Sequence, residues 1–170
     1  MAMLYVCSLS RLTETVSKVG AGHLVTLINS EMDVPTPPLI SPDQHLFLGF
    51  NDILAPINGL TPPAEAHVDR LLAFVGNWDR TAPLVIHCWA GISRSTAGAY
   101  ITACALNPEF NERDLAQELR KRAPSATPNG RLVSMADKIL GREGRMIDAI
   151  REIGRGATAF EGTPFEMPLN

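Results

Sequence analysis

A cysteine and an arginine stand six positions apart in a short segment of unusual composition. Cys88 is followed by Arg94, with Gly91 between them. A deprotonated thiol is a nucleophile, and a guanidinium presents a planar fork that binds two oxygens of one phosphate group. Glycine permits the positive φ that a tight turn requires. These residue types at this spacing indicate nucleophilic chemistry on a bound phosphate.

The position of the segment favours the same chemistry. Residues 84–86 form a continuous apolar run, typical of a central strand buried on both faces, and a helical pattern follows at 95–106. A loop that leads into a helix presents unpaired amides and the positive end of the helix dipole. These groups would hold phosphate and would also stabilise a thiolate at Cys88. Attack on phosphorus, followed by hydrolysis of the phosphocysteine, would cleave a phosphoester without a metal or other cofactor.

The segment resembles the signature of the cysteine-dependent protein tyrosine phosphatase superfamily, His-Cys-x-x-Gly-x-x-Arg-Ser/Thr. Every fixed position is matched, by His87, Cys88, Gly91, Arg94 and Ser95. The small size and the order of elements are similar to the dual-specificity or atypical branch, and most similar to its small bacterial members. The resemblance implies that Cys88 is the nucleophile, that Arg94 clamps the phosphate and that the Ser95 hydroxyl assists departure of the thiolate. His87 would orient the loop.

The resemblance also implies that the whole loop surrounds the phosphate. The expected phosphate-binding residues are Trp89, Ala90, Gly91, Ile92, Ser93 and Arg94.

A general acid is needed to protonate the leaving oxygen, and members of this superfamily supply an aspartate from a separate upstream loop. Asp52 is the chosen candidate, because it directly follows the strand-like run 45–50 in a loop containing Asn, Pro and Gly. Asp43 precedes that run, and Asp69 and Asp79 belong to the helix that follows.

Strand and helix patterns alternate through the first half of the chain, and helical patterns dominate the second. Strands are expected at 4–8, 23–28, 45–50 and 84–88, and helices at 12–19, 61–79, 95–106, 111–123, 129–140 and 143–153. The second helix is expected to begin at Thr61, an N-cap residue followed by proline. We therefore predict one α/β domain over residues 1–155, with a mainly parallel sheet of four to five strands flanked by helices, similar to dual-specificity phosphatases. Residues 156–170 are expected to be an irregular tail.

Composition excludes several other classes of protein. The chain has 170 residues, of which 45% are hydrophobic, and a net charge of −3, so it is neither disordered nor strongly basic. Nucleic-acid and membrane-surface binding are therefore not expected. No run approaches the roughly 18 apolar residues that span a bilayer, and the first residues do not read as a signal peptide. We expect a cytoplasmic protein, and the sequence leaves its oligomeric state open.

The expected substrate is a phosphorylated protein, with phosphotyrosine first, or a small aryl phosphate. The loop interior carries no lysine or arginine before Arg94, which favours a singly phosphorylated substrate. Two other functions remain open: a catalytically silent phosphate-binding module and a rhodanese-like sulfur transferase. Turnover of an aryl phosphate distinguishes the enzyme from the binding module, and thiosulfate activity would reveal the transferase.

Two further features have competing interpretations. Two basic groups could recruit an acidic substrate, although a solvated helical face is the favoured explanation: residues 120–122, and the set Arg142, Arg145, Arg151 and Arg155. Cys7 could form a protective disulfide with Cys88, whereas Cys104 is expected to be a core residue.

Overall fold

The computed structural model describes residues 3–169, and these form five strands and six α-helices. The strands are β1 (Met3–Ser8), β2 (His23–Ile28), β3 (His45–Gly49), β4 (Leu84–Cys88) and β5 (Phe165–Pro168). The helices are α1 (Leu12–Val19), α2 (Glu65–Gly76), α3 (Arg94–Leu106), α4 (Glu112–Arg122), α5 (Gly130–Ile139) and α6 (Arg145–Ile153). Two short 3-10 turns, η1 (Leu9–Arg11) and η2 (Pro42–Gln44), precede α1 and β3.

The sheet has the order β3-β2-β4-β1-β5. β1, β2, β3 and β4 run parallel, and β5 is antiparallel to β1. The register pairs Ser8 with Cys88 and Ile28 with Gly49, so the carboxyl ends of the four parallel strands lie at one edge. Loops that leave this edge are brought together, and in open α/β sheets this is where ligands bind.

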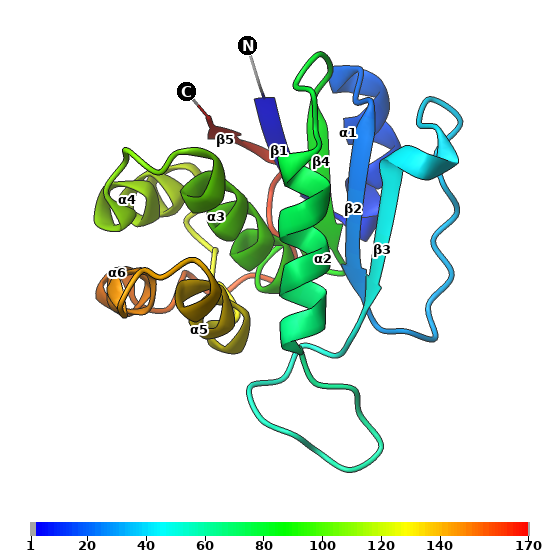
Figure 1. Cartoon of the computed structure of the whole chain (residues 1–170). Coiled ribbons are helices and arrows are strands. Elements are labelled where there is room, and N and C mark those ends of the chain that lie inside the picture. The colour runs from blue at the N-terminus through cyan, green and yellow to red at the C-terminus, as the bar shows by residue number, and fades with distance from the viewer. Residues whose placement is uncertain (1–2, 170) are drawn as a thin grey trace.

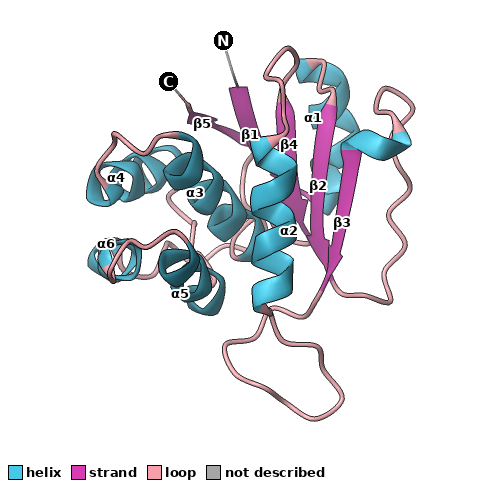
Figure 2. Cartoon of the chain, viewed as in Figure 1, coloured by secondary structure: helices cyan, strands magenta, loops and turns pink. Residues whose placement is uncertain are grey.

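Helices cover the two faces of the sheet unequally (Figures 1 and 2). α1 packs on one face, where Leu12 and Val16 meet Val85 of β4 in the smaller core. The helices α2 to α6 lie on the other side, and α3 packs directly on β4, β1 and β2 within the larger core. All five residues of β4 are buried, as expected for a central strand covered on both faces. The predicted single α/β fold is confirmed.

The predicted start of the second helix is wrong. α2 begins at Glu65, whereas Thr61 pairs with Asn51: its N–H donates to the Asn51 side chain and its carbonyl accepts from the Asn51 amide. Pro62 is followed by Pro63, and a residue that precedes proline is disfavoured in helical conformation. The helix therefore starts after the second proline.

The expectation of a wholly irregular tail is also wrong. Residues 165–168 form β5, whose register pairs Val6 with Phe165 and Leu4 with Met167. Met167 is completely buried, so the strand contributes to the core. A four-residue strand that contains Glu166 and Pro168 gives no clear periodic signal, and its pairing depends on the exposed edge of β1. Residues 154–164 have no helix or strand, and residue 170 lies outside the described residues.

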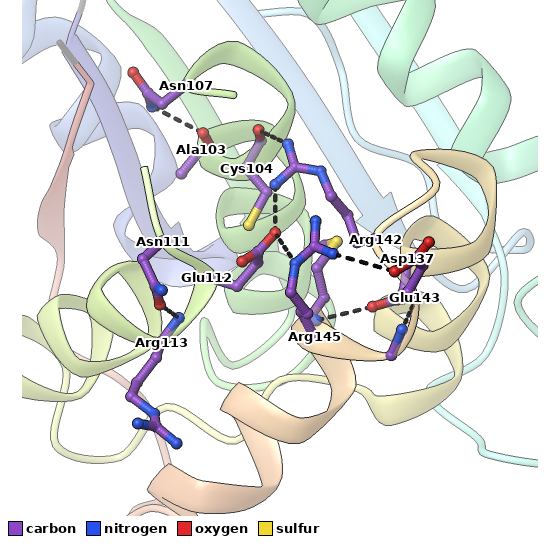
Figure 3. Close-up of polar contacts among 12 residues, drawn as sticks. Ala103, Cys104, Asn107, Asn111, Glu112, Arg113, Asp137, Arg142, Glu143 and Arg145 are labelled. Atoms are coloured by element: carbon purple, nitrogen blue, oxygen red, sulfur yellow. Dashed lines mark hydrogen bonds and ion pairs between the residues drawn. The ribbon is translucent and has the colours of Figure 1, made fainter. Parts of the chain in front are cut away.

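The helical layer contains a buried ion-pair cluster (Figure 3). Glu112 at the start of α4 accepts hydrogen bonds from Arg142 at 2.7 Å and from Arg145 at 3.2 Å. Arg142 also donates to the Cys104 carbonyl at the end of α3. This cluster joins α3 and α4 to the turn between α5 and α6. None of the helices between residues 3 and 169 is both long and apolar enough to cross a bilayer.

Candidate active site

The segment from Cys88 to Arg94 forms a tight loop between β4 and α3 at the carboxyl edge of the sheet. Cys88 is the last residue of β4 and is buried. Its Sγ accepts a hydrogen bond from the Gly91 N–H at 3.3 Å and lies 3.1 Å from the Ser95 hydroxyl. The loop therefore folds back over the thiol, with one main-chain donor and one hydroxyl beside the sulfur.

Four carbonyl groups of this loop accept hydrogen bonds from three other segments of the chain. Leu9 N–H donates to the carbonyl of residue 89, and Gly162 N–H donates to that of residue 90. Thr127 N–H donates to the carbonyl of residue 92, and Asn129 N–H to that of residue 93. In a planar trans peptide the C=O and the following N–H point in opposite directions. The amides of residues 90, 91, 93 and 94 are therefore directed toward the inside of the loop.

Gly91 allows the backbone to make this turn. Its φ is +71°, in the left-handed region that favours glycine, and a Cβ there would lie only 2.9 Å from the Ser8 amide nitrogen. A larger residue would push the loop away from the end of β1. With the amides inward and α3 beginning at Arg94, the loop forms a concave anion site of the kind found at helix N-termini.

Arg94 is buried and its contacts with the protein are to neutral oxygens. Its Nη1 donates to the Asn29 side-chain oxygen at 2.7 Å and to the Phe50 carbonyl at 2.8 Å. No carboxylate within residues 3–169 forms an ion pair with it. Nε and Nη2 have no hydrogen-bond acceptor among the described side chains and main chain, so two donors of the fork remain for an anion.

His87 is linked to the loop through a directed chain of hydrogen bonds. The Cys88 carbonyl, 3.1 Å from Nδ1, can only accept, so the His87 proton is on Nδ1. Nε2 then accepts from the Thr26 hydroxyl at 2.8 Å, and Thr26 in turn accepts from His45 Nε2 at 2.7 Å. Burial lowers the pKa of His87 to about 4, so its ring is neutral at pH 7. His87 therefore positions the main chain of the nucleophile and does not carry charge.

Asp52 lies against the loop, in the connection between β3 and α2. Its Oδ1 accepts from the Ser93 hydroxyl and from the Asn129 side-chain amide, both at 2.8 Å. Among the other aspartates considered, Asp43 lies in η2 and Asp79 bonds Thr81, both before a strand and thus at the opposite edge of the sheet. Asp69 is exposed on α2, and of the four aspartates only Asp52 has a hydrogen bond to the loop within the described residues.

The C-terminal segment is a part of the site that sequence reasoning missed. Besides the bond from Gly162 to the loop, the ring of Phe160 packs edge-on against Trp89, with centroids 5.5 Å apart. Glu161 accepts hydrogen bonds from the hydroxyls of Ser8 and Ser10. A Cβ at residue 162 would lie 2.7 Å from the Gly91 carbonyl oxygen, so only glycine allows this approach. No local pattern in the tail marks these contacts.

Asn29 is a second residue that was missed, and its position could have indicated it. It directly follows β2, just as Asp52 closely follows β3, at the carboxyl edge of neighbouring strands. The side chain of Asn129 caps α5 by accepting from the Leu132 N–H, and it also donates to Asp52.

Neither of the other two cysteines has a hydrogen bond to Cys88 within the described residues. Cys7 belongs to the core on the α1 face of the sheet, whereas Cys88 belongs to the core on the opposite face. Their side chains thus point to opposite sides of neighbouring strands, which does not favour a disulfide between them. Cys104 is buried in α3. Burial raises the pKa of both Cys7 and Cys104 to about 12, so both thiols are protonated at pH 7.

Solved structures with a similar fold include dual-specificity and tyrosine phosphatases. Human DUSP28 has a TM-score of 0.61 and 18% identity, over 89% of this chain and 95% of that one. A mouse putative dual-specificity phosphatase, in complex with zinc tungstate, has a TM-score of 0.58 and 18% identity, over 82% of this chain and 80% of that one. The human tyrosine phosphatase-like serine/threonine/tyrosine-interacting protein has a TM-score of 0.61 and 18% identity, over 84% of this chain and 97% of that one. No protein-family model matches this chain, and no curated protein matches it significantly.

Proposed function

We propose that this protein is a metal-independent phosphomonoester hydrolase that acts through a phosphocysteine on Cys88. The observation that carries the proposal is the convergence of three groups in one loop. The Cys88 sulfur lies at its base, the amides of the loop turn inward, and Arg94 keeps two donors that the protein does not use. A tetrahedral dianion matches this set of donors in charge and in geometry.

The first chemical step forms the phosphoenzyme. Loop amides and the Arg94 fork hold the three non-bridging oxygens while the Cys88 thiolate attacks phosphorus in line. The S–P bond forms as the P–O bond to the leaving group breaks. Asp52 gives its proton to the leaving oxygen, and its contact with Ser93 keeps it beside the loop.

The second step releases phosphate. A water molecule attacks phosphorus and passes a proton to the Asp52 carboxylate, and the S–P bond breaks. The Ser95 hydroxyl, 3.1 Å from the sulfur, donates to the departing thiolate. His87 holds the Cys88 carbonyl throughout, so the sulfur keeps its place at the base of the loop.

The proposed substrate is a phosphorylated protein, with phosphotyrosine first and a small aryl phosphate as the simplest analogue. The loop interior before Arg94 has no lysine or arginine, which favours a substrate with a single phosphate in the loop. The related fold of phosphatases supports this class of reaction. A cytoplasmic location and a place among the small bacterial members of the superfamily stay predictions from the sequence.

Hydrolysis of p-nitrophenyl phosphate without added metal tests the proposal. Wild type should hydrolyse this substrate, and Cys88→Ser should be inactive. In Asp52→Asn, kcat should decrease about 10²–10⁴-fold. Asp43→Asn is the matched control, because Asp43 lies at the opposite edge of the sheet. A folded, reduced wild type without turnover would favour the silent phosphate-binding module, and sulfur transfer from thiosulfate would favour the transferase.

A further inference from the structure

A large cavity opens directly beside the candidate phosphate loop. Its volume is about 550 Å³, and Asp52 and Ser93 form the side nearest the loop. The end of α6 and residues 154–159 of the C-terminal segment also line it. A substrate with its phosphate on the loop would have neighbouring atoms next to this cavity.

Hydrogen bonds between the C-terminal segment and the 123–127 turn hold one wall of the cavity in place. Arg120 donates to the carbonyls of residues 123, 124 and 126 and, through Nη2, to that of Gly154. Ala157 N–H donates to the Pro124 carbonyl, and Gly156 N–H donates to the Thr127 hydroxyl. A Cβ at residue 156 would lie 2.4 Å from the Ser125 main chain, so glycine is needed for this close contact. The C-terminal segment is thus fixed against the 123–127 turn.

The charge on this wall is positive. Of the four arginines between residues 142 and 155, Arg142 and Arg145 form ion pairs with Glu112 inside the helical layer, as Figure 3 shows. The other two, Arg151 and Arg155, line the cavity. Arg151 has one weak, exposed ion pair with Asp148 at 3.9 Å, and Arg155 has no ion pair within the described residues. Among the lining residues that the structure describes, Asp52 is the one carboxylate.

A second cavity of about 240 Å³ continues the surface away from the loop. It shares Ile150 and Arg151 with the first and is bordered by Leu54, which is two-thirds exposed. The two cavities together follow one side of α6. An elongated surface with cationic and apolar parts fits an extended peptide better than it fits a compact small molecule.

We propose that this cavity is a second recognition site, which takes an acidic side chain close to the phosphorylated residue of a protein substrate. Arg151 and Arg155 bind the carboxylate while the phosphate occupies the loop. The inference rests on the proposed phosphatase activity and adds a substrate class to it: phosphoproteins with Asp or Glu near the scissile residue. The charge of the cavity defines the ligand, because both arginines line the cavity that begins at the loop residue Ser93.

A set of phosphotyrosine peptides tests this site. In each peptide a single Glu is placed at one of the three positions on either side of phosphotyrosine, and the matched peptide carries Gln there. For at least one position, wild type should have a kcat/KM about fivefold higher for Glu than for Gln. The preference should decrease as salt is raised, because the arginines are exposed.

The Glu-to-Gln ratio is then measured for Arg155→Glu and for a control variant, Lys18→Glu. Lys18 is exposed on α1, on the opposite face of the sheet, and its substitution changes the net charge by the same amount. Arg155→Glu should bring the ratio to one or below, and Lys18→Glu should retain the wild-type ratio. A wild-type ratio near one at every position, or an equal loss in both variants, would overturn the second site while leaving the proposed hydrolysis intact. Absence of p-nitrophenyl phosphate turnover would instead overturn the proposed function itself.

Discussion

Two buried arginines in this protein have nearly equal exposure and very different surroundings. Arg94 is 7% exposed and contacts only the neutral oxygens of Asn29 and Phe50, whereas Arg142 is 8% exposed and lies 2.7 Å from the Glu112 carboxylate. Burial acts to raise the pKa of Glu112, but hydrogen bonds from Arg142 and Arg145 outweigh it and lower that pKa. The charge of Arg142 is therefore compensated inside the protein, and the charge of Arg94 is not.

This difference separates a structural arginine from a ligand-binding one. A buried charge without a counter-ion is costly, and it is retained where a bound anion supplies the missing partner. The inward amides near Arg94 indicate the same ligand, because those of residues 90, 93 and 94 have no acceptor among the described residues and that of Gly91 donates to the Cys88 sulfur. Arg142, by contrast, donates to the Glu112 carboxylate and to the Cys104 carbonyl, so its charge is paired within the protein.

Substitution of Arg94 should have the largest effect. Arg94→Met removes the fork that holds two phosphate oxygens, so kcat/KM for p-nitrophenyl phosphate should decrease about 10³–10⁵-fold. The free energy of unfolding should change much less than in Arg142→Met, because no carboxylate loses its partner. Steady-state kinetics and urea unfolding check both parts. Normal turnover by the folded variant would contradict the role of Arg94.

Substitution of Arg142 should mainly affect stability. Arg142→Met leaves Glu112 buried with only Arg145 beside it, so the free energy of unfolding should decrease by about 3 kcal/mol. The double variant with Glu112→Leu should recover much of this loss, since it removes the unpaired charge. Urea unfolding of both variants measures the effect. If the double variant were less stable than the single one, the pair would not be the source of the loss.

His87 differs from both buried arginines, because it is a buried base that is neutral at pH 7. Burial lowers its pKa from 6.5 to about 4, so between these values the unfolded chain binds a proton that the folded protein does not. Its contribution to stability should be complete above pH 6.5 and should be lost as the pH falls toward 4, by up to about 3 kcal/mol.

The unfolding free energy of wild type and His87→Gln, measured from pH 8 to pH 4, tests this contribution. Between pH 6.5 and pH 4, the unfolding free energy of the variant should decrease less than that of wild type. The difference between the two proteins at pH 8 gives the effect of the substitution that does not depend on pH. Parallel profiles would show that His87 does not titrate in this way.

Gly162→Ala should have the smallest effect on stability. The added Cβ meets the Gly91 carbonyl oxygen, so the C-terminal segment must shift and the bond to the loop weakens. We expect a loss of about 1 kcal/mol in stability, together with about a tenfold decrease in kcat, because the loop amides move. Gly141→Ala is a control at a glycine whose Cβ would meet nothing within 4 Å, although its positive φ adds some strain. Equal effects on kcat in both variants would show that the contact with the loop is not required.

The parts of the molecule that depend on short, contiguous segments could be predicted from the sequence. The loop from Cys88 to Arg94, with the buried strand before it and the helix after it, lies in one stretch of chain. Asp52 was chosen because it directly follows the strand-like run 45–50 in a loop upstream of the cysteine, and its contact with Ser93 is consistent with that choice. Its role as general acid stays a prediction.

The remaining features depend on how distant segments meet. The chain from His45 through Thr26 to His87 requires the register of three adjacent strands, which periodicity does not fix. The contacts of Phe160 and Gly162 with the loop require that β5 pair with β1, which returns the tail to the site. The contacts of Glu161 with Ser8 and Ser10 likewise join residues more than 150 positions apart.

Direct detection of the phosphoenzyme is the most decisive measurement. Wild type and Ser95→Ala are mixed with p-nitrophenyl phosphate, quenched with acid within the first turnovers and examined by peptide mass spectrometry. The account predicts one phosphoryl group on the peptide that contains Cys88, with more accumulated in Ser95→Ala because departure of the thiolate is slower. Steady hydrolysis with no phosphate on that peptide in either protein would contradict a phosphocysteine mechanism.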